Sequence, residues 1–190
     1  MIYIIEHLEP KLWEWCILEY EHISETVGKE NLWFTNIKNK NDQKILVKFG
    51  KVFEKRVFEL NLNEICVLDP ESNKLLEPMD KNNFKYFIFG GILGDYPPRK
   101  RTKEELTIHF PICETRHIGK EQLSTDNAVF TVKQILDGKK FSELKFKDSP
   151  NIEINEFESI NLPYRYNLVN GKVFMSEKLL KELKEGKELN

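Results

Sequence analysis

The chain has 190 residues, of which 40% are hydrophobic and 32% are charged, and its formal net charge is −2. This length suits one domain, and this apolar content is enough for a buried core. Because acidic and basic residues nearly balance, the composition argues against a protein that coats nucleic acid through charge alone, although it leaves room for a local basic patch.

Cysteine usage and hydropathy exclude two further classes of protein. Cys16, Cys66 and Cys113 are odd in number and far apart, so they form neither a disulfide framework nor the paired spacing of a zinc site. The sequence has no signal-peptide pattern and no apolar run of about 20 residues. We therefore expect a cytoplasmic protein that binds neither a membrane nor a metal.

The first half of the chain alternates strand patterns with helical ones. Residues 1–5, MIYII, predict a buried first strand, and Glu6, His7 and Glu9 follow its end. The next predicted elements are a helix over 12–27 that stops at Gly28, a strand over 32–37, a polar loop over 38–43, a helix over 45–60, a strand over 65–68, and a loop or short helix over 71–83.

The stretch 84–105 organises the rest of the chain. Residues 84–89 are apolar and aromatic and predict a buried strand that ends at Gly90-Gly91. Gly94, Asp95 and a basic cluster at 99–103 follow. Open α/β sheets bind ligands in such loops, at the carboxyl ends of their strands. The glycines alone fit an ordinary turn equally well, and their spacing is neither that of a dinucleotide fingerprint nor that of a P-loop.

The second half continues the alternation of strands and helices. The pattern predicts a helix over 102–106 capped by Thr102, a strand over 111–114, a second ligand loop over 116–128, a helix that Ser124 or Thr125 caps and that stops at Gly138, strand pieces over 152–162, a turn at Asn170-Gly171, and a last helix that Ser176 caps and Gly186 ends. The alternation predicts a parallel sheet covered on both faces. We see no domain boundary, so we expect one domain over 1–190, with 150–190 as a C-terminal extension of it.

Several motifs together resemble one known family. They are IIEHLEP at 4–10, FIFGGILGD at 87–95, PPRKRT at 97–102, RHIGKEQLSTDNA at 116–128 and LPYRY at 162–166. In this order they are similar to a branch of the SPOUT-class S-adenosylmethionine-dependent methyltransferases. That branch includes a fungal enzyme that methylates an arginine of a ribosomal protein, and archaeal predicted RNA methyltransferases. The resemblance implies a Rossmann-like, mostly parallel α/β sheet with a C-terminal trefoil knot, which the periodicity of the sequence does not itself show.

The resemblance also implies that loops of the knot wrap S-adenosylmethionine in a bent shape. Carried over to this sequence, these loops span 68–70, 90–95 and 116–125. The implied cofactor-binding residues are Leu68, Asp69, Pro70, Gly90, Gly91, Ile92, Leu93, Gly94, Arg116, His117, Gly119, Leu123 and Thr125.

Methyl transfer from a sulfonium is an in-line displacement, so the protein mainly aligns the acceptor with the methyl group. An acceptor that must lose a proton also needs a base. Asp95 is the first candidate, with bracing of its loop as the alternative role. Glu6, which we expect at the ligand side of the sheet, is the second, because a carboxylate can pair with a guanidinium and orient it.

Four residues remain as candidate substrate contacts, namely His7, Glu19, Arg99 and Arg101. The alternatives are an ordinary loop histidine, a solvated helix face and a solvated basic segment. Two substrate classes stay open: an arginine of a ribosomal protein, by resemblance, and RNA, by the habit of the wider class. A non-catalytic cofactor-binding module is a third hypothesis. The sequence does not decide between a homodimer and a monomer.

Overall fold

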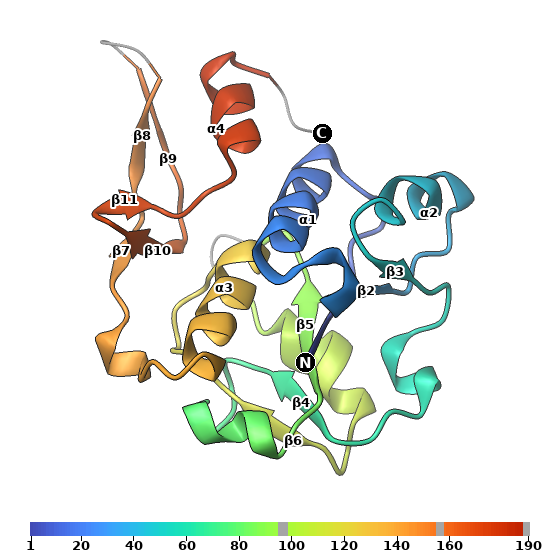
Figure 1. The fold of residues 1–190 in the computed structure, drawn as a ribbon. Helices are drawn as coiled ribbons and strands as arrows, with labels where there is room; N and C mark the ends of the chain where they lie inside the picture. The colour runs from blue at the N-terminus through green and yellow to red at the C-terminus, as the bar shows by residue number, and fades with distance from the viewer. Residues whose placement is uncertain (95–98, 155–157, 188–190) are drawn as a thin grey trace.

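The computed structural model describes residues 1–94, 99–154 and 158–187, and it is built around a six-stranded parallel sheet (Figure 1). The strand order is β3-β2-β1-β5-β4-β6, and each pairing in it is parallel. These strands are β1 (Ile2–His7), β2 (Leu32–Thr35), β3 (Lys51–Val52), β4 (Ile65–Leu68), β5 (Tyr86–Gly91) and β6 (Glu114–Arg116). The predicted mostly parallel α/β fold is confirmed.

Helical segments cover both faces of this sheet. The helices are α1 (Glu14–Val27), α2 (Lys40–Leu46), α3 (Thr125–Leu136) and α4 (Glu177–Lys184), and the shorter segments are η1 (Lys29–Asn31), η2 (Val57–Leu60), η3 (Pro78–Asn82), η4 (Thr102–Leu106), η5 (Thr107–His109) and η6 (Phe141–Glu143). Side chains alternate between the faces as strand geometry requires. Tyr3 and Phe87 pack under α1 and α3, whereas Ile4 and Ile88 pack against η2 and η4.

The region 38–60 differs from its prediction. We expected a polar loop followed by a helix over 45–60, but α2 occupies Lys40–Leu46 and β3 follows it. The side chain of Asn39 starts α2 by accepting hydrogen bonds from the N–H groups of Asn41 and Asp42, at 2.8 and 3.4 Å. Apolar spacing alone missed this cap, and it could not foresee that Lys51 and Val52 would pair with β2.

Three strand ends also differ from their predictions. β1 runs on through Glu6 and His7, and β5 runs on through Gly90 and Gly91, because these residues pair with one another in register. A Cβ on Gly91 would overlap the Tyr20 hydroxyl, so glycine is required here by the packing of Tyr20 and not by a turn. β6 lies at Glu114–Arg116 instead of 111–114, and Thr102 lies inside η4, after the cap residue Arg101.

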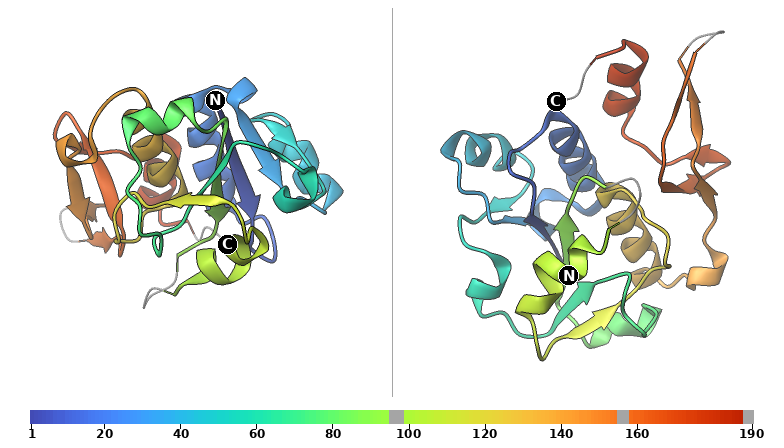
Figure 2. Two further views of the ribbon diagram at one scale, coloured as in Figure 1. Left: turned by 90° about the horizontal axis from the view of Figure 1, so that it is seen from below. Right: turned by 180° about the vertical axis from the view of Figure 1, so that it is seen from behind.

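The C-terminal region stands beside the parallel sheet (Figures 1 and 2). It holds an antiparallel sheet, β7 (Phe146–Asp148), β10 (Arg165–Val169) and β11 (Lys172–Val173), the hairpin β8 (Asn151–Glu153) and β9 (Ser159–Asn161), and α4. Leu162, Tyr166, Leu179 and Leu183 form a small core that packs on Trp15 and Leu18 of α1. The expected turn is confirmed, since Asn170 and Gly171 have φ of 52° and 77°, and Ser176 accepts from Leu179 N–H at 3.4 Å.

Among the described residues, no helix has the length and apolarity that crossing a bilayer requires. The trefoil knot stays a prediction.

Candidate functional site

A cavity of about 530 Å³ opens at the carboxyl ends of β4, β5 and β6. The loops after these strands form three of its walls, and residues 99–103 and the C-terminal region complete it. The C-terminal region contributes Asp148, Ser149, Pro163, Tyr164 and Arg165. This is the edge at which parallel α/β sheets bind their ligands.

Most of the cofactor residues that the resemblance implied lie on this cavity. The lining includes Leu68, Asp69, Pro70, Gly90, Ile92, Gly94, Gly119, Leu123 and Thr125, together with the candidate substrate residues Arg99 and Arg101. Gly91, Leu93, Arg116 and His117 are neighbours in the same loops and stand outside the lining. Asp95 lies outside the described residues.

The wall near Gly94 combines apolar surface with polar groups that sequence reasoning missed. The Tyr164 hydroxyl donates to the carbonyl of Gly94 at 2.7 Å. A Cβ on Gly94 would overlap the carboxamide nitrogen of Gln122 and come within 2.7 Å of the Tyr164 ring. That Gln122 nitrogen is buried and has no hydrogen-bond partner among the described residues. The motif LPYRY contains Tyr164 and was the signal that could have found it.

Basic side chains connect the loops around the cavity. The Lys120 ammonium donates to the carbonyls of Pro70 and Ser72, at 2.6 and 2.7 Å. Lys100 pairs with Glu71 in the loop after β4. Lys120 and Lys100 therefore hold neighbouring loops against each other. Lys100, a member of the basic cluster at 99–103, is paired with a carboxylate of the chain and is not simply a solvated cation.

Glu6 and His7 lie inside the molecule and away from the cavity lining. The Glu6 carboxylate accepts from Arg56 Nε at 2.7 Å, Thr35 Oγ1 at 2.6 Å and Val57 N–H at 2.9 Å. His7 Nδ1 lies 3.0 Å from the Tyr20 hydroxyl, and burial lowers the pKa of His7. Through these contacts, Glu6 holds the start of η2 against the sheet.

Arg116 has structural partners as well. Its guanidinium donates to both oxygens of Asp80, at 3.0 and 3.1 Å, and lies over the ring of Phe84. His117 Nδ1 accepts from Gly119 N–H at 3.2 Å. Both residues thus fix the loop after β6 through internal contacts and do not line the cavity.

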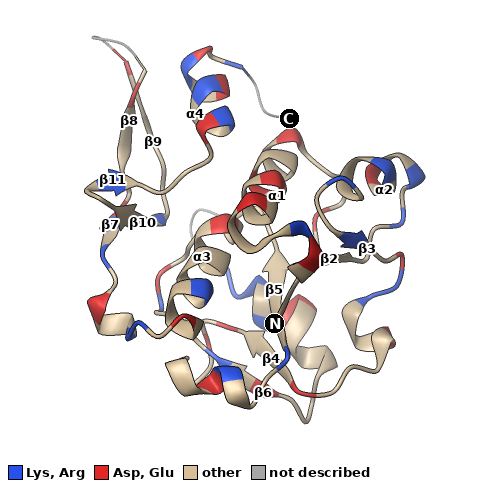
Figure 3. Cartoon of the chain, in the orientation of Figure 1, with Lys and Arg blue, Asp and Glu red and all other residues tan. Residues whose placement is uncertain are grey.

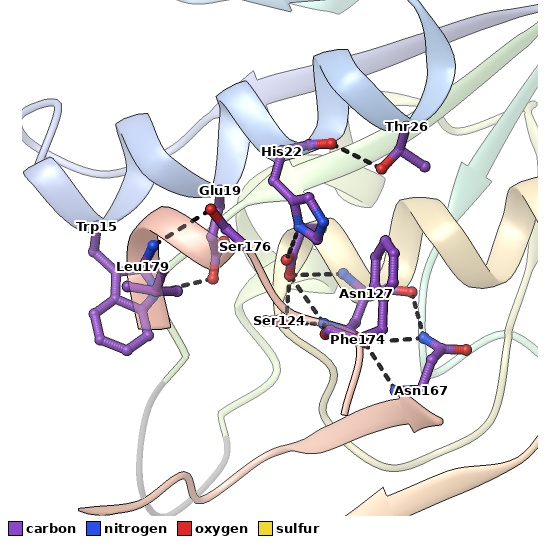
Figure 4. Close-up of polar contacts among 11 residues, drawn as sticks. Trp15, Glu19, His22, Thr26, Ser124, Asn127, Asn167, Phe174, Ser176 and Leu179 are labelled. Carbon is purple, nitrogen blue, oxygen red and sulfur yellow. Dashed lines mark hydrogen bonds and ion pairs between the residues drawn. The ribbon is translucent and has the colours of Figure 1, made fainter. Parts of the chain in front are cut away.

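Glu19 belongs to a buried polar network between α1, α3 and β10 (Figure 4). Its carboxyl group accepts from Trp15 Nε1 at 2.8 Å. The neighbouring Asp126 accepts from Ser124 Oγ at 2.6 Å, from Asn127 N–H at 2.7 Å and from His22 Nδ1 at 2.8 Å. Asp126 lies in the first turn of α3, where a carboxylate is favoured by the helix dipole.

Burial and the charge of Asp126 raise the pKa of Glu19 to about 8, while hydrogen bonds from Trp15 and Thr125 oppose the rise. Glu19 therefore keeps its proton at neutral pH, and the oxygens of the neighbouring Asp126 accept from three other donors. Thr125, which donates to Glu19, also lines the cavity, so the buried carboxyl group contacts a residue of the cavity wall.

Comparisons with known proteins agree with this geometry. Residues 2–189 match the family described as protein arginine N-methyltransferase SFM1-like. The protein arginine N-methyltransferase SFM1 of Saccharomyces cerevisiae is 38% identical over 202 residues, covering 97% of this chain and 95% of the relative. The crystal structure of the yeast arginine methyltransferase SFM1 complexed with SAM superposes with a TM-score of 0.89 at 37% identity, covering 97% of this chain and 90% of that one.

A more distant structure shares the fold alone. The dual-specific Trm10 of Thermococcus kodakaraensis has a TM-score of 0.59 at 20% identity, covering 75% of this chain and 96% of that one. The predicted SPOUT-class fold is therefore confirmed. With nearly its whole length matched, the chain belongs to the SFM1-like family of protein arginine N-methyltransferases.

Proposed function

We propose that this protein transfers the methyl group of S-adenosylmethionine to an arginine side chain of a protein. The observation that carries the proposal is the cavity at the carboxyl ends of β4, β5 and β6, walled by the loops that the motifs single out. The yeast relative is named a protein arginine N-methyltransferase, and its crystal structures are complexes with SAM, SAH and MTA.

The residues of the cavity fit such a cofactor. A volume of about 530 Å³ lies within the range of roughly 300–1,000 Å³ typical of small-molecule sites. Leu68, Phe89, Ile118 and Leu123 offer apolar surface for a purine, and the Gln122 nitrogen, which has no partner in the described part of the chain, offers a donor. When bound there, S-adenosylmethionine supplies a methyl group activated by its sulfonium, so the chain has to align and desolvate the acceptor.

Carboxylates lie around the cavity, and three of the four on its walls are already paired with cations of the chain. Asp69, Glu71, Glu121 and Asp148 lie on its walls. Glu121 and Asp148 hold a guanidinium of the chain itself, since Arg165 donates to both at 2.6 Å. Asp95 follows Gly94 directly, and we assign it the role of orienting the acceptor or taking its proton.

The charge of α1 also favours a basic protein over RNA. This helix carries glutamates and no lysine or arginine (Figure 3). Glu14 and Glu25 are exposed on it. A ribosomal protein is the acceptor that we expect, because ribosomal proteins are basic and expose arginines.

The test is the transfer of labelled methyl groups from S-adenosylmethionine to ribosomes from a strain of the source organism that lacks this protein. Label that survives nuclease and runs with one protein, and that hydrolysis assigns to arginine, would establish the proposed activity. The variant Asp95→Asn should leave cofactor binding intact and abolish the transfer. If the protein binds the cofactor but labels no protein, the remaining interpretation is a non-catalytic cofactor-binding module.

RNA is the second candidate, and one observation favours it. Six basic side chains, Arg99, Lys100, Arg101, Lys103, Lys120 and Arg165, lie on the cavity. However, Lys100 is paired with Glu71, and Arg101 with Glu9 and Glu105. An RNA substrate predicts label that nuclease removes and binding that weakens steeply with salt, because phosphate contacts release counterions.

A further inference from the structure

The carboxylate of Glu9 contacts both flanks of the segment 93–101. Its Oε1 accepts from the backbone N–H of Leu93 at 3.0 Å and from Arg101 Nη1 at 2.7 Å. Arg101 Nη2 also donates to the carbonyl of Leu8 at 3.3 Å. The two residues that follow β1 thus hold the chain where it leaves the end of β5 and again where it enters η4.

These contacts are sheltered from water. The side chains of Glu9 and Arg101 are only 10% and 15% exposed. Charge-assisted hydrogen bonds in such surroundings are stronger than those between neutral groups and less screened by salt. Without Glu9, Arg101 would keep its bond to Glu105 Oε1 at 2.7 Å, whereas the N–H of Leu93 would lose its acceptor. Glu9 is therefore the member of the pair that joins the two flanks.

Both flanks form the wall of the cavity. Ile92 and Gly94 line it on the incoming side, and residues 99–103 line it on the outgoing side. Glu9 itself stands behind this wall. A wall fixed before the ligand arrives spares the binding reaction the conformational entropy of ordering it, which is how preorganisation raises affinity.

We infer that Glu9 and Arg101 form a positioning pair that fixes the two flanks of the segment 93–101 and so sets the affinity of the cavity for S-adenosylmethionine. The inference rests on the proposed function for the identity of this ligand. Arg101 is then an internal partner of Glu9 rather than a contact with substrate, and Glu9, the second of the two glutamates in the motif IIEHLEP, has a defined role.

The test compares Glu9→Ala, Glu9→Gln, Arg101→Met and the double variant Glu9→Ala/Arg101→Met by calorimetric titration with S-adenosylmethionine. Glu9→Ala should weaken binding about tenfold, the effect of about 1.4 kcal/mol. Glu9→Gln should recover part of this loss, because its amide oxygen still accepts from Leu93 N–H. The double variant should bind about as weakly as Glu9→Ala, because residues that act as a unit are not additive.

Matched controls separate positioning from general stability. Lys40 and Glu54 form an ion pair on the surface, with side chains 71% and 61% exposed and outside the cavity lining, so Glu54→Gln should bind like the wild type. Thermal unfolding shows which variants are folded, and Glu9→Gln and Arg101→Met carry the test if Glu9→Ala does not fold. In the transfer assay, the KM for the cofactor should rise in parallel with its Kd, while the KM for the protein acceptor stays unchanged.

The inference is overturned if Glu9→Ala or Glu9→Gln binds S-adenosylmethionine with the affinity of the wild type. It is also overturned if the double variant loses an affinity equal to the sum of the losses in its two single variants. The proposed function fails separately, if the wild type binds the cofactor but transfers nothing, because the calorimetric comparison still decides the pair. A wild type that does not bind S-adenosylmethionine would overturn both.

Discussion

Replacing Glu19 by Gln removes a buried acid and should stabilise the protein increasingly as the pH rises. The pKa of Glu19 is raised to about 8 in the folded chain, from 4.5 in the absence of structure, and its side chain is almost fully buried. Between these two values the unfolded chain releases the proton and the folded chain retains it. Stability therefore falls with pH in this window, by at most about 1.4 kcal/mol per unit, and levels off above it.

The magnitude is large enough to measure. Between pH 5 and pH 7 the difference in unfolding free energy between Glu19→Gln and the wild type should grow by up to about 3 kcal/mol in favour of the variant. For a chain of this length that corresponds to a relative gain of roughly 6–10 °C in Tm. The neutral amide can still accept from Trp15 Nε1, so the geometry of the network is largely kept.

The assay is urea unfolding at pH 5, 6, 7 and 8, with Glu25→Gln on the exposed face of α1 as the matched control. The titration of groups other than Glu19 is common to both chains and largely cancels in the difference. A difference that stays constant with pH, or a variant that loses stability relative to the wild type as the pH rises, would refute the assignment of the retained proton to Glu19.

The remaining predictions concern the cavity and the sheet beneath it. Gly94→Ala should bind S-adenosylmethionine too weakly for calorimetry to detect, because its Cβ would overlap Gln122; wild-type affinity would show that this wall can move aside. Lys120→Met should lower the affinity about tenfold with little change in Tm, since the ammonium joins the carbonyls of Pro70 and Ser72; equal affinity would mean that the two loops hold their places unaided. Gly91→Ala should lower the unfolding free energy by about 2 kcal/mol in urea titrations, because the new methyl group would overlap the Tyr20 hydroxyl; an unchanged midpoint would contradict this packing.

Sequence reasoning located the sheet and most of the cavity because both depend on local patterns. The apolar runs of β1, β4 and β5 alternate between the two faces of the sheet, and the motifs mark the loops at their carboxyl ends. In contrast, α2 was missed because its start depends on the side chain of Asn39, a single cap that hydrophobic spacing does not register.

Contacts between side chains that are far apart in the sequence could not be predicted from local patterns. Glu19 reads as one of several glutamates on a solvated helix face, and only the approach of α3, more than a hundred residues later, buries it beside Asp126. Arg101 reads as part of a basic cluster, and only the fold brings Glu9 to it. The helical period shows which residues share a face of a helix, but it does not show which other elements pack against that face.

The contribution of Tyr164 and Arg165 to the cavity wall has a consequence for synthesis of the protein. The strands of the parallel sheet and α3 all precede residue 140, so they leave the ribosome first and can begin to fold there. The wall that Tyr164 completes does not yet exist at that stage. A nascent chain therefore acquires its complete ligand site only after Tyr164 and Arg165 have been made, and until then the ligand cannot act as a folding template.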